Sequence, residues 1–283
     1  MSRLLTLFGS DSGGWALKSL ADLGYSVANP AAFGVWADAA RSKTNSSTLM
    51  VFTNPSSTLL FEILLRAQTT GDKISVYWDD GSSNDYTLNN MAGADTAVGH
   101  TYAAAANRTI VVCGAERVRR LYSAQTDGRS AFGGNVSSWT WLTYLRVTGN
   151  NTLSGSVAGL TDLTSLSVTG SNTLSGSVAA LTDLTSLSVT GSNTVIGFDG
   201  VAASATKLSY LKMNNALSEA VVNAILAGFW ANRDVAKTRE ERLIDLNDNA
   251  GSAAPTGQGI IDKAALQAYV SPPGAVVWTV ETN

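Results

Sequence analysis

Three aspartates in this sequence are close enough together to bind a metal ion. Asp79, Asp80 and Asp85 fall within seven residues, and carboxylate oxygens are ligands that calcium prefers. Their spacing is not that of an EF-hand loop. We therefore expect a structural role for these aspartates and no bound metal, with calcium binding as the alternative.

The single histidine and the single cysteine limit the covalent chemistry that the chain can do. His100 could act in a hydrolase triad with a serine and an aspartate, but the sequence contains no GxSxG nucleophile elbow. Cys113 ends an apolar run, which is typical of a buried small apolar side chain, and a reactive thiol is the alternative. We expect no catalytic residue and no cofactor.

Positive charge is sparse along the chain. Arg117, Arg119 and Arg120 form a basic cluster, and no Lys or Arg occurs between Arg146 and Lys207. The formal net charge is −3 and the pI is about 5.2, whereas nucleic-acid binding requires a basic surface. We expect the arginine cluster to be a solvated edge rather than a phosphate contact, and we expect no nucleic-acid partner.

Uncharged hydroxyl groups replace the missing charges. Only 14% of the residues are charged, against roughly 25% in typical soluble proteins, whereas Ser and Thr make up 61 of the 283 residues. No apolar run approaches the roughly 18 residues of a membrane span, so we expect no membrane partner. The apolar run at residues 4–8 is shorter than that of a signal peptide, and we expect no export by the general secretory route.

A repeat with a period of 21 residues occupies the middle of the chain. It is clearest from Leu160 and again from Leu181, with a preceding copy from Trp139, a following copy near Leu208 and a fainter one near Val118. Hydroxyl and apolar residues alternate within each copy, which predicts a short strand with one buried face. We predict parallel neighbouring strands with these leucines inward: Leu145, Leu166, Leu187 and Leu211. The following serines should point outward: Ser165, Ser167, Ser186 and Ser188.

These copies resemble leucine-rich repeats that read LxxLxxLxLxxNxLxGxI. Ser-Val stands at residues 156–157 and 177–178, where plant-type repeats carry Ile-Pro. The resemblance implies a solenoid with a parallel sheet, in which Asn172 and Asn193 bond the backbone of the turns. It does not specify a function, because solenoids of this type bind many unlike partners.

Two tyrosines and two aspartates are the candidate functional residues of the repeats. Tyr144 and Tyr210 occupy a strand position that serine holds in the central copies, and they could form a binding strip for sugar or protein. Ordinary surface or packing positions are the alternative. Asp162 and Asp183 could supply the carboxylate pair of a glycosidase, but we expect both to lie on loops before the strands.

Residues 43–114 predict a separate domain of short strands. Runs rich in β-branched and aromatic residues occur at residues 49–53, 58–65, 73–78 and 109–113, with turn clusters between them. Strands at this spacing predict a small antiparallel sandwich.

Two segments of this domain resemble PKD-like immunoglobulin modules. Residues 76–82 and 100–103 are similar to the WGDGS…HTYxxxGxYTVT pattern, with Asp79 in place of the first glycine and residues 105–108 in place of Gly-x-Tyr. The resemblance implies that the aspartate closes a tight turn and that the stretch from His100 begins a strand.

The two ends of the chain predict helices. Residues 12–23 are compatible with a helix, and Asn29 followed by Pro30 is a suitable start for a second one. These helices carry Trp15, Phe33 and Trp36, which could pack within the domain or dock the chain in a larger assembly. Near the other end we predict a helix at 218–230 capped by Ser218, a strand at 243–247, a helix at 262–269 and a strand at 277–280. This order is similar to the capping end of phage-type repeat proteins.

We therefore predict a mixed, mainly β fold in three parts. These are a helical docking segment at 1–42, a PKD-like sandwich at 43–114, and a capped leucine-rich solenoid at 115–283. The order resembles bacterial leucine-rich surface proteins and phage structural proteins.

The resemblance implies a non-enzymatic bacteriophage virion protein. We favour a tail or baseplate component that contributes to host-surface attachment. The alternatives are a capsid decoration protein or a bacterial adhesin located on the cell surface. The expected partners are other virion proteins through residues 1–42, a host surface glycan or protein on the repeats, and further copies of this chain.

Overall fold

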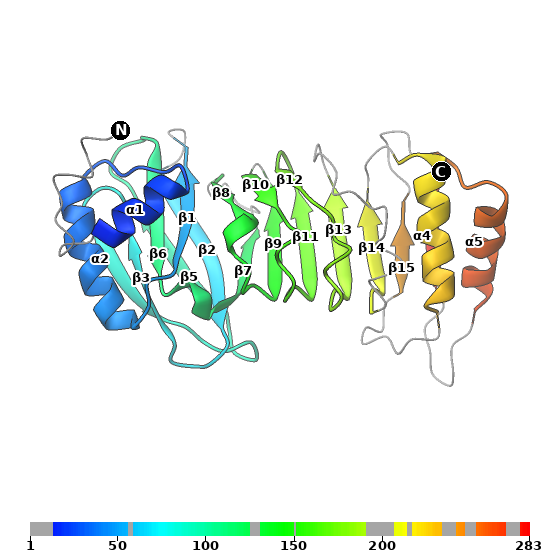
Figure 1. Cartoon of the computed structure of the whole chain (residues 1–283), viewed down its shortest axis with the longest axis horizontal. Coiled ribbons are helices and arrows are strands. Elements are labelled where there is room, and N and C mark those ends of the chain that lie inside the picture. Colours follow the sequence, from blue (N-terminus) through cyan, green and yellow to red (C-terminus); the bar gives the residue numbers. More distant parts are fainter. Residues whose placement is uncertain are drawn as a thin grey trace. The chain divides into compact units, whose positions relative to one another are not determined.

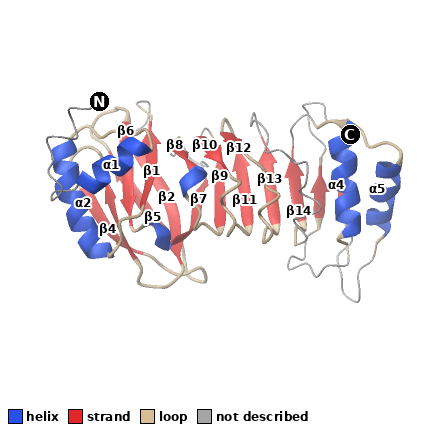
Figure 2. Ribbon diagram, viewed as in Figure 1, coloured by secondary structure: helices blue, strands red, loops and turns tan. Residues whose placement is uncertain are grey.

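The chain folds into two compact units that are mainly β (Figures 1 and 2). The computed structural model describes residues 14–55, 59–124, 131–149, 151–190, 207–213, 217–233, 242–246, 253–269 and 278–283. Unit 1 is Met1–Leu142 and unit 2 is Thr143–Asn283.

Unit 1 contains two groups of antiparallel strands. The first has the order β8-β1-β6-β3-β4, with β1 at Leu49–Asn54, β3 at Lys73–Tyr77, β4 at Ser83–Thr87, β6 at Arg108–Cys113 and β8 at Gly133–Asn135. The second has the order β7-β2-β5, with β2 at Leu60–Ala67, β5 at Thr96–Thr101 and β7 at Val118–Ala124. Short 3-10 turns lie at Ala115–Arg117 and Val136–Ser138.

Aromatic side chains join these two groups of strands. The ring of Phe52 on β1 lies 5.5 Å from Phe61 on β2, 5.5 Å from Phe132 and 5.3 Å from Trp139. Phe61 is also 5.9 Å from Trp78. All five side chains are at most 1% exposed, so the facing surfaces of the strands form one aromatic core.

Two helices cover the other face of the first strand group. Helix α1 spans Gly14–Asp22 and helix α2 spans Pro30–Thr44. Phe33 and Trp36 of α2 pack on Tyr77, with ring centroids 5.3 and 5.5 Å from it. Leu49, Val51, Val111 and Cys113 belong to the same core cluster. The central strands β1 and β6 are therefore buried on both faces, which explains the continuous apolar runs in their sequences.

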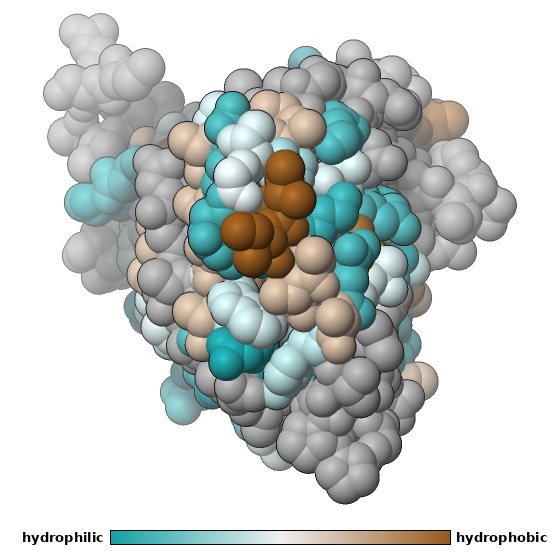
Figure 3. Space-filling view, turned by 90° about the vertical axis from the view of Figure 1, so that its right-hand side faces the viewer, coloured by the Kyte–Doolittle hydropathy of each residue, from teal (hydrophilic) through white to brown (hydrophobic). Residues whose placement is uncertain are grey.

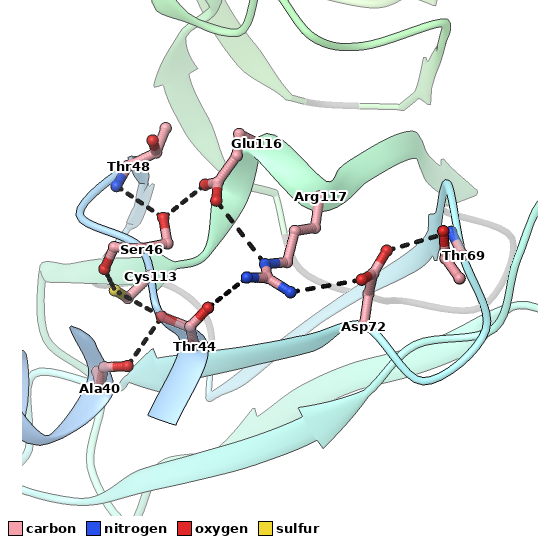
Figure 4. A network of polar contacts seen from close by, with 9 residues as sticks. All are labelled: Ala40, Thr44, Ser46, Thr48, Thr69, Asp72, Cys113, Glu116 and Arg117. Atoms are coloured by element: carbon pink, nitrogen blue, oxygen red, sulfur yellow. Dashed lines mark hydrogen bonds and ion pairs between the residues drawn. The ribbon is translucent and has the colours of Figure 1, made fainter. Parts of the chain in front are cut away.

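A polar network fixes the end of α2 (Figure 4). The Arg117 guanidinium donates to the carbonyl of Thr44, the last residue of the helix, at 2.5 Å. It also lies 3.4 Å from Asp72 and 3.7 Å from Glu116, and Glu116 accepts a hydrogen bond from Ser46 at 2.7 Å. A cation at a helix C-terminus is favourable because the carbonyls there carry partial negative charge.

Unit 2 contains a β-solenoid of about three turns. Its main ladder is parallel and runs β9-β11-β13-β14-β15-β16, with bounds Tyr144–Thr148, Ser165–Thr169, Ser186–Thr190, Tyr210–Met213, Leu243–Asp245 and Thr279–Glu281. A second parallel pair is formed by β10 at Thr152–Ser156 and β12 at Thr173–Ser175. The predicted parallel strands are thus confirmed, in register, and their four leucines are fully buried.

Gly176 lies against the preceding turn of the solenoid in a left-handed backbone conformation. It has φ +90°, and a Cβ atom built on it would lie 2.3 Å from the Ser156 hydroxyl oxygen. A larger residue would therefore be strained by this φ and would displace the Ser156 side chain.

Two helices pack together at the C-terminal part of unit 2. Helix α4 spans Glu219–Ala231 and helix α5 spans Gln258–Ala268. The Ser218 side chain accepts a hydrogen bond from the amide of Val221, which confirms it as the N-cap. Phe229 of α4 packs edge-on against Trp278 at 5.2 Å. Ile260 and Ile261 of α5 are 56% and 59% exposed, and apolar residues are visible on this side of the unit in Figure 3.

Several boundaries differ from the sequence predictions. Strand β4 was not predicted, and β5 places His100 near its end rather than at the start of a strand. The last strand is Thr279–Glu281 instead of 277–280. The predicted N-cap at Asn29 is confirmed, since its side chain accepts from the amide of Ala32.

Candidate functional site

The outer face of the main ladder in unit 2 carries two rows of serines, which we call the serine strip: Ser165, Ser167, Ser186 and Ser188. Strands β11 and β13 present these serines in register, because Ser165 pairs with Ser186 and Ser167 with Ser188. The apolar residues between the serines point into the core. Because successive side chains of a strand point to opposite faces of the sheet, the repeated Ser-x-Ser sequence places its serine hydroxyls on one face.

The strip is bounded on both sides by an aromatic and a cationic residue. Tyr144 of β9 pairs with Ser165, and Arg146 pairs with Ser167. On the other side, Tyr210 and Lys212 of β14 pair with the serines of β13. The structure thus places the two sequence-predicted tyrosines in one row across the same face.

The distance between the two tyrosines follows from the ladder. Their strands are three steps apart, which corresponds to about 14 Å between their backbones. Both side chains are half-buried, so each ring rests partly on the sheet while part of its surface stays accessible.

The hydroxyls of the strip differ from the other hydroxyls of the same turns. Thr164 and Thr185 each donate to the carbonyl of the threonine one turn earlier, at 2.9 Å. Within the described residues, no hydrogen bond of the protein uses the side chain of any serine of the strip. The threonines therefore hold the turns together, whereas the hydroxyls of the half-buried Ser165, Ser167 and Ser188 stay available.

One serine of the strip corrects the sequence prediction. Ser186 was expected to point outward into solvent, but it is 6% exposed. It lies between Ser165 and Tyr210 in the ladder. In-register neighbours are roughly 4.8 Å apart, so Ser186 has a neighbouring residue on each side.

Charges lie at the margins of this face. Lys212 forms an ion pair with Asp245 of β15, and the hydrogen bond from this carboxylate raises the pKa of Lys212. Asp162 and Asp183 lie on the exposed turns before β11 and β13, as predicted. Asp183 pairs with Lys207.

The three neighbouring aspartates of unit 1 bond to different groups. Asp79, with φ +61°, accepts the backbone amides of Ala28 at 2.6 Å and Thr109 at 2.9 Å. Burial raises its pKa despite these hydrogen bonds. Asp80 accepts from Ser82. Asp79 thus ties the segment before α2 to the start of β6.

Asp85 has its own partners on neighbouring elements. It accepts from Lys43 of α2 at 2.7 Å and from Ser75 of β3 at 2.7 Å. Within the described residues, no three His, Cys, Asp or Glu side chains are grouped closely enough to hold a metal ion.

His100 lies in an aromatic cluster of unit 1. Its Nε2 atom is 2.7 Å from a carboxylate oxygen of Asp80, and its ring stacks on Trp78 with centroids 5.1 Å apart. Tyr102 packs edge-on against it at 4.6 Å, and burial raises the pKa of Tyr102 strongly. The imidazole of His100 thus lies against the rings of Trp78 and Tyr102, and its Nε2 atom contacts the carboxylate of Asp80.

Cys113 and the arginine cluster are engaged in packing and internal contacts. Cys113 is fully buried, and this burial raises the pKa of its thiol. Arg119 donates to the carbonyl of Trp141 at 2.6 Å. Arg120 lies 3.4 Å from Asp95, and the contacts of Arg117 are those shown in Figure 4.

The N-terminal aromatic residues are placed in or near the core of unit 1. Phe33 is fully buried, Trp36 is 8% exposed, and the Trp36 indole donates to the hydroxyl of Ser75 at 3.0 Å. Trp15 is partly buried and donates to Asp38 at 3.1 Å. This placement supports packing within the unit for Phe33 and Trp36.

The sequence reasoning anticipated a binding strip at Tyr144 and Tyr210 on the hydroxyl-rich face of the repeats, but it did not identify the four serines between them as its centre. Its signal was present, because serine recurs at alternate positions of two copies where tyrosine, arginine and lysine stand in the flanking ones. What the sequence could not reveal is that the threonine hydroxyls are used internally and the serine hydroxyls are not.

Comparisons of the chain with profiles of known protein families, with curated protein sequences and with solved structures gave no significant match. Among the described helices, none combines the length and the apolar character needed to cross a membrane.

Proposed function

We propose that this chain is a non-enzymatic structural protein of a bacteriophage particle, in a tail or baseplate, and that unit 2 contributes to host-surface attachment. The observation that carries the proposal is the serine strip, whose serines lie in register on adjacent strands and whose hydroxyls make no hydrogen bond within the described part of the protein. Such a surface on a regular ladder suits binding better than reaction, because it holds no acid, base or nucleophile pair.

The finer identity of both units belongs to the same proposal. Unit 1 is proposed to contain a PKD-like module, on the basis of the segments around Asp80 and His100. Unit 2 is proposed to be a leucine-rich solenoid, on the basis of the 21-residue period and the buried Asn172. The virion location rests on the resemblance of this module order to phage structural proteins.

Contacts with other virion proteins are proposed for the outer surface of the N-terminal helices. Phe33 and Trp36 are buried, so they do not carry this contact. Among the described residues of this region, from Gly14 onward, the exposed large apolar side chains are Val35, at 70%, and Leu23, at 38%. A capsid decoration protein and a bacterial surface adhesin are the alternative assignments.

The test is to locate the chain in its native setting. Phage particles from the source are purified by density gradient, analysed by mass spectrometry, and labelled with gold-conjugated antibodies against unit 2. We expect the chain in the particles and label at the tail end. Label over the head would support capsid decoration, and label on bacterial cells that release no particles would support the adhesin.

A further inference from the structure

We propose that the serine strip binds a neutral polysaccharide, with Tyr144 and Tyr210 stacking on sugar rings and the serine hydroxyls bonding to sugar hydroxyls. The inference rests on the proposed role of unit 2 as the attachment surface, and it names the class of ligand.

The first argument is the state of the hydroxyl groups. A serine hydroxyl can donate one hydrogen bond and accept others, and a sugar hydroxyl has the same double capacity. Ser165, Ser167 and Ser188 are half-buried, and no hydrogen bond within the described protein uses their hydroxyls. A ligand hydroxyl can therefore replace the water that these groups bond to in the free protein.

The second argument is charge. The two central strands carry no charged side chain on this face, because their outward residues are Ser and Thr. Lys212, at one margin, is already paired with Asp245, and Arg146, at the other margin, also interacts with a group of the protein. An acidic polysaccharide would gain little from such a surface, whereas a neutral one loses no hydration of a charge on binding.

The third argument separates a sugar from a protein partner. Protein interfaces are depleted in serine, and their hot spots are mainly buried aromatic, arginine and other large side chains. The centre of the strip has no apolar side chain directed outward. An added peptide strand would also find no free edge, because β11 and β13 are each paired on both sides.

The fourth argument is the position of the tyrosines. An aromatic ring offers an apolar face to the C–H face of a sugar and a hydroxyl to its rim. Tyr144 and Tyr210 stand at the two ends of the same row, roughly 14 Å apart by strand spacing. This separation suits an extended chain of several sugar units that crosses the strands, rather than a monosaccharide.

The experiment uses the full chain on an array of neutral and acidic oligosaccharides, followed by calorimetric titration with the best neutral hexasaccharide. Ser167→Arg fills the centre of the strip with a charged side chain. Ser171→Arg is the matched control, because Ser171 is an exposed serine of the same turn outside the strip. Tyr144→Ala removes one stacking ring, and Ser167→Ala with Ser188→Ala removes two hydroxyls without adding bulk.

We expect neutral oligosaccharides to bind. The Ser167→Arg and Tyr144→Ala chains should lose at least tenfold in affinity, while the Ser171→Arg chain binds as before. The double alanine variant should weaken binding with an unchanged melting temperature. Binding to acidic glycans only, no binding to any glycan, or neutral binding that Ser167→Arg leaves intact would each overturn the inference.

These outcomes are separate from the test of the proposed function. A chain that is present in the particles but binds no neutral glycan would overturn the ligand and leave the virion role standing. A chain that binds neutral glycans through the strip but is absent from particles would support the ligand and overturn the virion role.

Discussion

The side-chain amide of Asn172 joins two successive turns of the solenoid. Its oxygen accepts the backbone amide of Leu153 at 2.8 Å, and its nitrogen donates to the carbonyl of Thr169 at 3.2 Å. Asn172 is fully buried. A single buried side chain therefore satisfies two backbone groups, of which the amide of Leu153 lies in a buried hydrogen bond and the carbonyl of Thr169 in a partly buried one.

Removal of this amide should destabilise unit 2. The Asn172→Ala change leaves two backbone groups unpaired, and we expect a loss of roughly 2–4 kcal/mol in the free energy of unfolding. The measurement is urea denaturation followed by circular dichroism. The neighbouring exposed Ser171→Ala change is the control and should stay within about 0.5 kcal/mol. Equal effects of the two changes would contradict this role of Asn172.

Asp85 makes the stability of unit 1 depend on pH. Partial burial alone would raise its pKa, but the hydrogen bonds from Lys43 and Ser75 and the charges of Lys43 and Lys73 outweigh burial and lower the pKa. An acid with a lowered pKa stabilises the fold above its unfolded pKa of about 3.9, and this contribution is lost as the pH falls through the folded value.

We therefore expect Asp85→Asn to make the stability of unit 1 depend less on pH under acidic conditions. The melting temperature of the native chain should fall more steeply between about pH 4.5 and 2.5 than that of the variant. Thermal melts across this range provide the measurement. Lys43→Met removes the cationic partner and should also reduce the slope, and an unchanged slope in both variants would exclude the contribution of Asp85.

At the scale of elements, the sequence predicted those parts whose signals are local. Asn29 and Ser218 were identified as helix caps because a cap is set by adjacent residues. Strand β4 was missed because Ser83–Thr87 is almost entirely exposed and shows no apolar alternation. It is a strand because β3 supplies its hydrogen bonds, and such pairing is not visible in a single sequence.

The register of the serine strip was predictable from the sequence, but the burial of its residues was predicted only in part. The period of 21 residues places the four serines on one face, and the parallel register was correct. The burial of Ser186 was missed because burial depends on neighbouring strands, and the strand that pairs with it at Tyr210 follows a three-residue insertion in the repeat.

Helix α5 has one face in the core and one outside. Leu266 is fully buried, whereas Ile260 is 56% exposed. We expect Leu266→Ala to cost about 2–5 kcal/mol because a cavity remains in the contact with α4 and β16. Ile260→Ala should change the free energy of unfolding by less than about 0.5 kcal/mol. Chemical denaturation of the two variants gives the comparison, and a larger loss for Ile260→Ala would show that its exposed face is covered in solution.

At the scale of the whole molecule, the N-terminal helices complete unit 1. The apolar runs at residues 49–52 and 110–113 have no polar alternation, which indicates strands buried on both faces. The sequence does not reveal which segment supplies the second cover, because that contact joins residues far apart in the chain. The structure assigns it to α1 and α2, through Phe33 and Trp36.

Deletion of residues 1–44 should therefore unfold unit 1. The truncated chain would expose Leu49, Val51, Tyr77 and Val111 to water on one face, an apolar surface that promotes aggregation. We expect loss of the cooperative transition of unit 1 and aggregation in size-exclusion chromatography. A truncated chain that is monomeric and melts as a cooperative unit would show that the helices are a detachable segment.

Point variants in α2 test the same idea without removing any backbone. Trp36→Ala takes away a ring that contacts Phe33 and Tyr77 and an indole that bonds to Ser75, so we expect a loss of about 3–5 kcal/mol in the free energy of unfolding. Val35→Ala, one residue earlier, changes a side chain that is 70% exposed and should cost less than about 0.5 kcal/mol. If Val35 contributes to the proposed contact with other virion proteins, its change should reduce incorporation into particles while stability is kept. Trp36→Ala would then reduce stability, because Trp36 faces the core. Val35→Ala would reduce incorporation into particles, because Val35 faces outward.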